Sequence, residues 1–292
     1  MHLFDCLMKD KKREIELVVI SDVHLGTYGS QARELHHYLQ SIKPGILILN
    51  GDIIDFWQFS KRYWPKQHMK VVKDIFNLAA KGTQIYYITG NHDETMRKFA
   101  GLRIGSIEIV NKLELELNGK RTWFFHGDVF DVIMQHSRWL ERLGAIGYDS
   151  LILLNVFINY LSRLLGKGKI SLSKKIKDNV KTAVKFISHF EQTAATLALH
   201  KGYHAIVCGH IHQPEIKKIL MPKGGSITYL NSGDWLENLS ALEFNEGEWK
   251  LYRYYEDLLD TAGVIVEEET DENIEDMDSK DIFKMVMKEF QL

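Results

Sequence analysis

Short apolar runs recur along the chain, and each of the first few ends in a cluster of polar residues. These runs are Glu16–Ile20, Gly45–Leu49, Gln84–Ile88 and Ala205–Cys208. Continuous apolar runs of about four to six residues are typical of strands that are buried on both faces. Apolar residues at helical spacing fill the segments Arg33–Ile42 and His68–Ala80. This alternation of strands and helices predicts an α/β pattern.

Two further groups of short segments indicate additional strands. The first group holds an Asn-Gly pair, which is the strongest short-range signal of a hairpin turn. The segments are Ile107–Val110, Leu113–Leu117, Thr122–Phe125, Ser226–Leu230, Ser240–Phe244 and Trp249–Tyr255. We therefore predict an α/β (α+β) fold in which two mixed β-sheets pack as a sandwich flanked by helices.

The segment between these groups has a different character. Residues 131–203 give no strand signal and look helical throughout, and they are too long for a simple connection. We predict a helical insertion or cap there, within a main domain that spans residues 15–262. Residues 263–292 form an acidic C-terminal tail that could end in a short amphipathic helix.

Charge and cysteine content exclude some classes of protein. Lys and Arg number 37 against 39 Asp and Glu, a net charge of -2, so nothing favours a nucleic-acid partner. The two cysteines argue against a disulfide framework and for a reducing compartment. No segment reaches the roughly 20 apolar residues that cross a bilayer. We expect a cytoplasmic protein, with a peripheral position at the inner membrane surface left open.

The polar clusters supply the types of ligand that metals need. Carboxylate, imidazole and amide groups together suit Mn, Fe or Zn, and no cysteine joins them as in a structural zinc site. Because ligands bind outside the carboxyl ends of strands in α/β sheets, these clusters could converge. The clusters are Asp22-x-His24, Gly51-Asp52-x-x-Asp55, Gly90-Asn91-His92-Asp93, His126-Gly127-Asp128 and Gly209-His210-x-His212.

The five blocks, in this order, resemble the signature of the calcineurin-like metallophosphoesterases. The resemblance runs from about Val18 to Pro214. It implies two divalent ions, most simply Mn, that activate a water for attack on phosphorus. It also implies a first ion held by Asp22, His24 and His212, a second held by Asn91, His126 and His210, and Asp52 as the bridge.

The same resemblance gives roles to the remaining polar residues of the blocks. His92 would face the substrate, stabilise the transition state or protonate the leaving group, so His92 and Asp52 are the catalytic candidates. Asp55, Asp93 and Asp128 would orient the imidazoles. The other histidines match no block and are expected at the surface or in packing.

Three features have two readings each. We expect Phe56 and Trp57 to pack against neighbouring residues rather than to stack on a substrate. We expect Cys208 to act as a small apolar residue of the core. The segment 131–203 could be helices packed on the core, or a lid that accepts an acyl chain and touches a membrane. In the second reading, Lys174 and Lys175 are candidates for contacts with a substrate phosphate.

Within the superfamily, the chain most resembles the UDP-2,3-diacylglucosamine hydrolases of lipid A synthesis. The segment Gly51–Trp57 and the position of the helical insertion carry this resemblance. It implies a pyrophosphatase that releases UMP from a nucleotide-linked lipid. The best-known branch has Arg at the position of His92, a departure that bears on the substrate. The alternatives are a phosphodiesterase or phosphomonoesterase with a small soluble substrate, and more remotely a non-catalytic scaffold. The oligomeric state stays open.

Overall fold

A computed structural model describes residues 12–57, 63–130, 172–221 and 224–262. Two compact units divide the chain after Arg253, and the first of them holds both β-sheets. None of the helices within the described ranges combines the length and the apolar character that a membrane crossing requires. The predicted N-terminal part of the cap (131–171) and the acidic tail (263–292) lie outside the described residues.

The first sheet has seven strands in the order β12-β11-β1-β2-β3-β5-β4. β1, β2, β3 and β5 run parallel, while β11, β12 and β4 pair antiparallel with their neighbours. The strands are β1 (Arg13–Ile20), β2 (Ile42–Asn50), β3 (Gln84–Ile88), β4 (Arg103–Ile104), β5 (Ile107–Val110), β11 (Ser240–Asn245) and β12 (Glu248–Arg253).

The second sheet has five strands in the order β6-β7-β8-β10-β9. β7, β8 and β10 are parallel to one another, and the edge strands β6 and β9 run antiparallel to them. The strands are β6 (Leu113–Leu117), β7 (Lys120–Phe124), β8 (Ala205–Cys208), β9 (Glu215–Leu220) and β10 (Ser226–Asn231). The predicted pair of mixed sheets is therefore confirmed.

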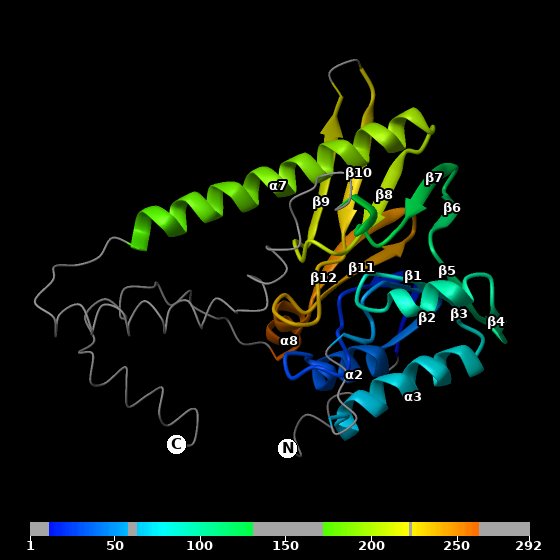
Figure 1. Ribbon diagram of the computed structural model, residues 1–292. Coiled ribbons are helices and arrows are strands. Elements are labelled where there is room, and N and C mark those ends of the chain that lie inside the picture. Colours follow the sequence, from blue (N-terminus) through cyan, green and yellow to red (C-terminus); the bar gives the residue numbers. More distant parts are fainter. Residues whose placement is uncertain (1–11, 58–62, 131–171, 222–223, 263–292) are drawn as a thin grey trace, which may run out of the picture. The chain divides into compact units, whose positions relative to one another are not determined.

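An apolar core joins the two sheets. Leu17, Val19 and Ile48 of the first sheet share this core with Phe124 and Val207 of the second. The intervening residues of β1 and β2 are also buried, because alternate side chains point to the opposite face of the sheet. Helices α2 (Ala32–Ser41) and α3 (Lys66–Ala80) cover that face (Figure 1).

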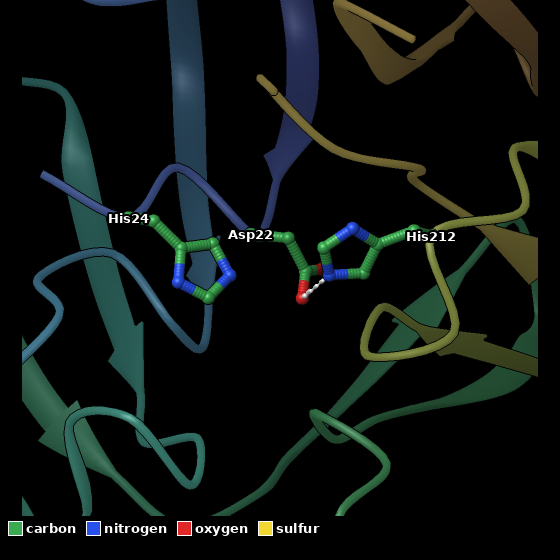
Figure 2. Close-up of side chains that lie close together, drawn as sticks. All are labelled: Asp22, His24 and His212. Atoms are coloured by element: carbon green, nitrogen blue, oxygen red, sulfur yellow. Dashed lines mark ion pairs between the residues drawn. The ribbon is translucent and has the colours of Figure 1, made fainter. Parts of the chain in front are cut away.

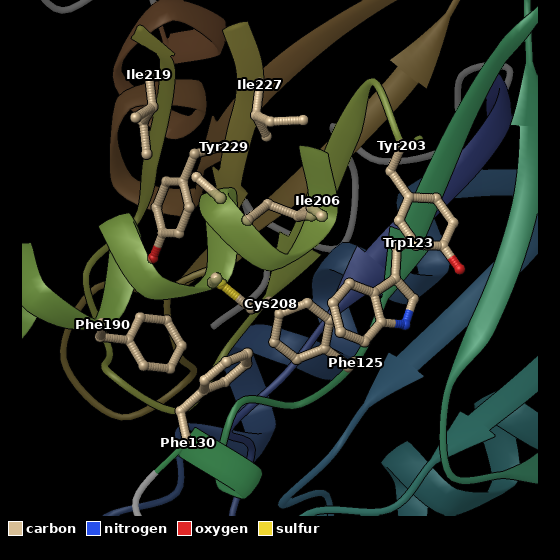
Figure 3. Packing of buried hydrophobic residues seen from close by; sticks show 13 residues of the cluster. Trp123, Phe125, Phe130, Phe190, Tyr203, Ile206, Cys208, Ile219, Ile227 and Tyr229 are labelled. Atoms are coloured by element: carbon tan, nitrogen blue, oxygen red, sulfur yellow. The ribbon is translucent and has the colours of Figure 1, made fainter. Parts of the chain in front are cut away.

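The outer face of the second sheet is covered by the long helix α7 (Leu172–His200). Phe190, Ala194, Ala195 and Ala198 are buried against aromatic and aliphatic residues of β7, β8 and β10 (Figure 3). Cys208 is fully buried in the same cluster, as predicted. The second half of α7 thus packs on the sheet; the sequence left open whether residues 131–203 pack on the core or form a lid.

Two predictions of secondary structure were incomplete. The predicted strand Trp249–Tyr255 ends at Arg253, and Tyr254 begins helix α8 (Tyr254–Ala262) in the second compact unit. The sequence also gave no warning of β9 or of the two-residue strand β4. A short 3-10 helix, η1 (Glu94–Phe99), follows the Asn91–Asp93 block.

Candidate metal centre

The predicted site residues follow the carboxyl ends of parallel strands in both sheets. Asp22 follows β1, Asp52 follows β2 and Asn91 follows β3, whereas His126 follows β7 and His210 follows β8. Because the two sheets face each other, these strand ends meet at one edge of the sandwich. The structure therefore brings together side chains that are up to 190 residues apart in the sequence.

Among the described residues, potential ligands form three groups at this edge. Two of them share no residue and are called the two donor groups: Asp22, His24 and His212 offer ligand atoms within 4.8 Å of one another, and so do Asp52, His126 and His210. The third group, His24, Asp55 and His92, shares His24 with the first. Figure 2 shows the first group, in which the imidazole Nε2 of His212 lies 3.2 Å from Asp22 Oδ1. Asn91 lies beside the second group, with its Oδ1 3.3 Å from His126 Nε2. The division of ligands between two ions that the family resemblance implied stays a prediction.

The backbone at these positions is strained in a consistent way. Asp22, His24, Asp52, His210 and His212 all have positive φ, between 50° and 69°. Non-glycine residues adopt this left-handed conformation rarely, at a cost of roughly 1–3 kcal/mol each, and such strain clusters at functional sites. The sharp turns aim side chains from successive strand ends toward one place.

Glycines allow the strand-end loops to approach one another closely. A Cβ at Gly51 would lie 2.3 Å from His126 Nδ1, and one at Gly90 would lie 2.2 Å from Asp52 Oδ1. A Cβ at Gly209 would similarly meet Asp22. Glycine is thus required at these three positions for the two groups to form.

Buried carboxylates and imidazoles in this cluster shift each other's pKa. Burial opposes ionisation of Asp22, yet the charge and hydrogen bond of His212 together with the charge of His126 outweigh it and lower the pKa of Asp22 to about 2. Burial likewise favours neutral His212, but Asp22 raises the pKa of His212 to about 9. Asp52 and His126 form the corresponding pair, in which the pKa of Asp52 is lowered and that of His126 is raised. The buried carboxylates therefore require positive charge beside them.

The hydrogen bonds of the imidazoles fit a metal centre. His126 Nδ1 donates to the carbonyl oxygen of Asn50 at 2.9 Å, which turns Nε2 toward Asp52 and Asn91. His24 Nδ1 contacts Asp55, and its buried Nε2 has no hydrogen-bond partner among the described residues. A buried imidazole nitrogen without a hydrogen-bond partner, beside carboxylates, is suited to bind a cation.

Asp55 contacts two imidazoles at once. Its Oδ2 lies 3.2 Å from His24 Nδ1 and 2.9 Å from His92 Nδ1. His92 is further packed against Trp57, with ring centroids 4.3 Å apart, although the Trp57 side chain is half-exposed. The backbone N–H of His92 donates to Asp52 Oδ1 at 2.8 Å. His92 is thus fixed beside both groups.

Asp93 and Asp128 make other contacts than the imidazole contacts expected for them. Asp93 accepts hydrogen bonds from the backbone N–H groups of Ile53 and Gly90 and from the Tyr87 hydroxyl. It thereby ties two of the loops together, and burial raises its pKa. Asp128 forms an ion pair with Arg97. Lys174 and Lys175 belong to the first turn of α7, but their side chains are outside the described residues.

Sequence reasoning missed a sixth polar cluster, Asn231-Ser232-Gly233-Asp234, which follows β10. Asp234 is fully buried, and its Oδ2 lies 3.8 Å from His212 Nδ1. Its Oδ1 accepts hydrogen bonds from three successive backbone N–H groups, those of Leu236, Glu237 and Asn238. The cluster follows an apolar run just as the recognised blocks do, and that signal could have revealed it.

A family model described as calcineurin-like phosphoesterase matches residues 15–214. The chain belongs to this family. It is therefore a metal-dependent hydrolase, as the sequence predicted, and the residues present provide oxygen and nitrogen donors suited to divalent ions.

Curated relatives cover most of the chain at low identity. A UDP-2,3-diacylglucosamine hydrolase of Aeromonas salmonicida is 25% identical over 84% of this chain and 95% of its own length. One from Pseudomonas putida is 25% identical over 80% of this chain and 97% of its own. A solved dimetal phosphatase from Danio rerio covers 82% of this chain and 98% of that one, at 12% identity and a TM-score of 0.38.

Proposed function

We propose that this chain is a dinuclear pyrophosphatase that releases UMP from a UDP-linked diacylated sugar. The observation that carries the hydrolytic part is the pair of adjacent donor groups at the strand ends, each with one carboxylate and two imidazoles. The choice of substrate is supported by relatives named UDP-2,3-diacylglucosamine hydrolase, which match most of the chain.

Two ions would be held by separate sets of residues that share one bridge. Asp22, His24 and His212 would hold the first, and Asn91, His126 and His210 the second, with Asp52 bridging. Mn is our first choice, with Fe and Zn as alternatives, because the donors mix carboxylate, amide and imidazole. When bound, the ions would supply Lewis-acid activation of the attacking water and neutralise charge on the phosphoryl oxygens.

The chain itself would supply a positioned proton donor. Asp55 accepts from His92 Nδ1, so when the imidazole carries a proton on both nitrogens, Nε2 is the atom that can donate to the leaving oxygen. Trp57 covers one face of the imidazole and limits its rotation. Asp52 accepts from the backbone N–H of His92 and so links the catalytic imidazole to the bridging carboxylate. Membrane contact through residues 131–203 and a phosphate contact by Lys174 or Lys175 belong to the same proposal.

The test is UMP release from UDP-2,3-diacylglucosamine by the Mn-loaded protein, followed by chromatography. His92→Ala should lower kcat by about 10²–10⁴-fold with little change in bound metal. Asp52→Asn should lower both activity and metal content. His200→Ala, at the exposed end of α7, is the matched control and should behave like the wild type.

Hydrolysis of bis(p-nitrophenyl) phosphate separates the possible failures. If the wild type cleaves this simple diester but releases no UMP from the lipid nucleotide, the proposed substrate is wrong while the phosphoesterase assignment holds. If both variants keep full activity with either substrate, the proposed site is wrong.

A further inference from the structure

A cavity of about 220 Å³ opens beside the second donor group, on the side of His126. Thr89, Asn111, Arg97 and Asp128 contribute polar groups to its wall. Among the described residues that line it, Arg97 is the only lysine or arginine. The roles proposed above for the two donor groups and His92 do not use Arg97, Thr89 or Asn111.

Arg97 is held close to the proposed metal ligands. Its Nη2 donates to the carbonyl oxygen of Gly90 at 3.2 Å, and Gly90 directly precedes Asn91. The same glycine packs so tightly on Asp52 that a Cβ there would lie 2.2 Å from Asp52 Oδ1. The backbone of Gly90 thus lies between the Arg97 guanidinium and the carboxylate of Asp52, the proposed bridging ligand.

The ion pair with Asp128 leaves the cation more exposed than the carboxylate. The side chain of Arg97 is 38% exposed, against 11% for Asp128. Both contacts that fix the guanidinium use Nη2, and a guanidinium carries further N–H donors on Nη1 and Nε. Asp128 therefore acts as an anchor that orients Arg97 through Nη2, and neither of these contacts uses the donors on Nη1 and Nε.

Thr89 and Asn111 contribute a further hydrogen-bond donor to the cavity wall. The Thr89 hydroxyl donates to Asn111 Oδ1 at 3.1 Å, so the remaining polar group of the Asn111 carboxamide is its NH₂ donor. Guanidinium and amide donors around one space match a phosphoryl group, whose oxygens accept hydrogen bonds and which Arg binds with fixed geometry.

We propose that Arg97 binds the second phosphoryl group of a diphosphate substrate, the one that the water does not attack. This inference rests on the proposed function, because a diphosphate carries its two phosphoryl groups on one bridging oxygen. With one group at the metal centre, its neighbour enters the adjoining cavity. Arg97 is then a specificity-determining residue that favours diphosphates over compounds with a single phosphate.

The experiment measures binding rather than turnover. Calorimetric titration of the Mn-loaded protein uses UMP and the non-hydrolysable uridine 5′-(α,β-methylene)diphosphate, with free Mn held constant. The wild type should bind the diphosphonate more tightly. Arg97→Gln should weaken diphosphonate binding by about 10–100-fold, the usual effect of losing a charged hydrogen bond, and change UMP binding less than about threefold.

Two further variants distinguish binding from a purely structural clamp. Arg97→Lys keeps the positive charge and should restore part of the lost affinity for the diphosphonate. Arg103→Gln removes an exposed arginine of β4 that pairs with Glu108, and should leave both affinities unchanged. Metal content and circular dichroism of every variant verify that the fold is intact.

The inference would be overturned if both Arg97 variants lost affinity for UMP and for the diphosphonate to the same extent. It would also be overturned if the variants bound both ligands as tightly as the wild type does. These results do not depend on the natural substrate. If the diphosphonate preference vanishes in Arg97→Gln but the wild type releases no UMP from the lipid nucleotide, the proposed function fails and the inference stands. If the wild type releases UMP from the lipid nucleotide, but the preference for the diphosphonate over UMP is unchanged in the Arg97 variants, only the inference about Arg97 fails.

Discussion

At the scale of single residues, Asp55 shows how one carboxylate can organise two functional groups. Its Oδ2 contacts the imidazoles of His24 and His92, and the side chain is almost fully buried. A carboxylate that accepts from Nδ1 keeps the neutral imidazole in the form whose Nε2 can bind a metal. The contribution of Asp55 is therefore orientation.

Asp55→Asn should weaken Mn affinity by about 10–100-fold, because the amide can donate toward Nδ1 and favour the wrong tautomer. Equilibrium dialysis against Mn measures this effect. Asp74→Asn is the matched control, since Asp74 is a buried aspartate that pairs with His36 and Gln40 between α2 and α3. If both variants lose metal to the same extent, Asp55 has no special role.

The candidate site was largely predictable at this scale because its residue types recur after apolar runs. The positions of His24, His126 and His210 follow from that pattern alone. The partners of Asp93 and Asp128 could not be predicted in this way. The sequence pattern around an aspartate is the same whether its carboxylate contacts an imidazole, a backbone N–H or Arg97. Arg97 itself lies in a helical turn that belongs to no block.

At the scale of elements, strand prediction succeeded where the apolar positions are regular. β3, β5, β6 and β8 begin and end at the residues that the apolar runs indicated, although β6 is a half-exposed edge strand and β8 is fully buried. β9 was missed because it is an edge strand in which the adjacent Lys217 and Lys218 interrupt the apolar positions Ile216 and Ile219, so that it resembles a polar loop. β4 has only two residues, too few for any periodicity.

The second half of helix α7 should contribute to stability, because it supplies part of the apolar cluster on the outer face of the second sheet. Phe190 is fully buried between Phe130 and the sheet. Phe190→Ala should lower the free energy of unfolding by about 3–5 kcal/mol, measured by urea denaturation. Phe76→Ala on α3, where the ring is 56% exposed, should cost less than about 1 kcal/mol. If Phe190→Ala lowered the free energy of unfolding no more than Phe76→Ala, this half of α7 would not be part of the core.

At the scale of the whole molecule, the metal-free protein should respond to pH through the Asp22–His212 pair. The pKa of His212 is raised from 6.5 to about 9, so its stabilising contribution is complete below pH 6.5 and is lost as the pH rises toward 9. The free energy of unfolding of EDTA-treated protein should therefore fall between pH 6.5 and 9, as followed by urea titration.

His212→Asn should remove this part of the pH dependence, and His200→Asn, which changes an exposed histidine, should retain it. Saturating Mn should also remove it, because a metal-binding imidazole has already lost its proton. The same slope in the wild type and His212→Asn would show that other groups determine the response.

The pairing of β1 with β11 has a consequence for synthesis of the chain. β1 is a central strand, yet its antiparallel partner lies more than 220 residues later, as in the pairing of Leu17 with Phe244. A nascent chain emerging from the ribosome keeps one side of β1 open until almost the entire protein has been made. Open strand edges invite pairing with other chains, so dependence on chaperones should be concentrated in this interval. His212 also emerges late, so a metal site that includes it cannot form during the early steps of folding.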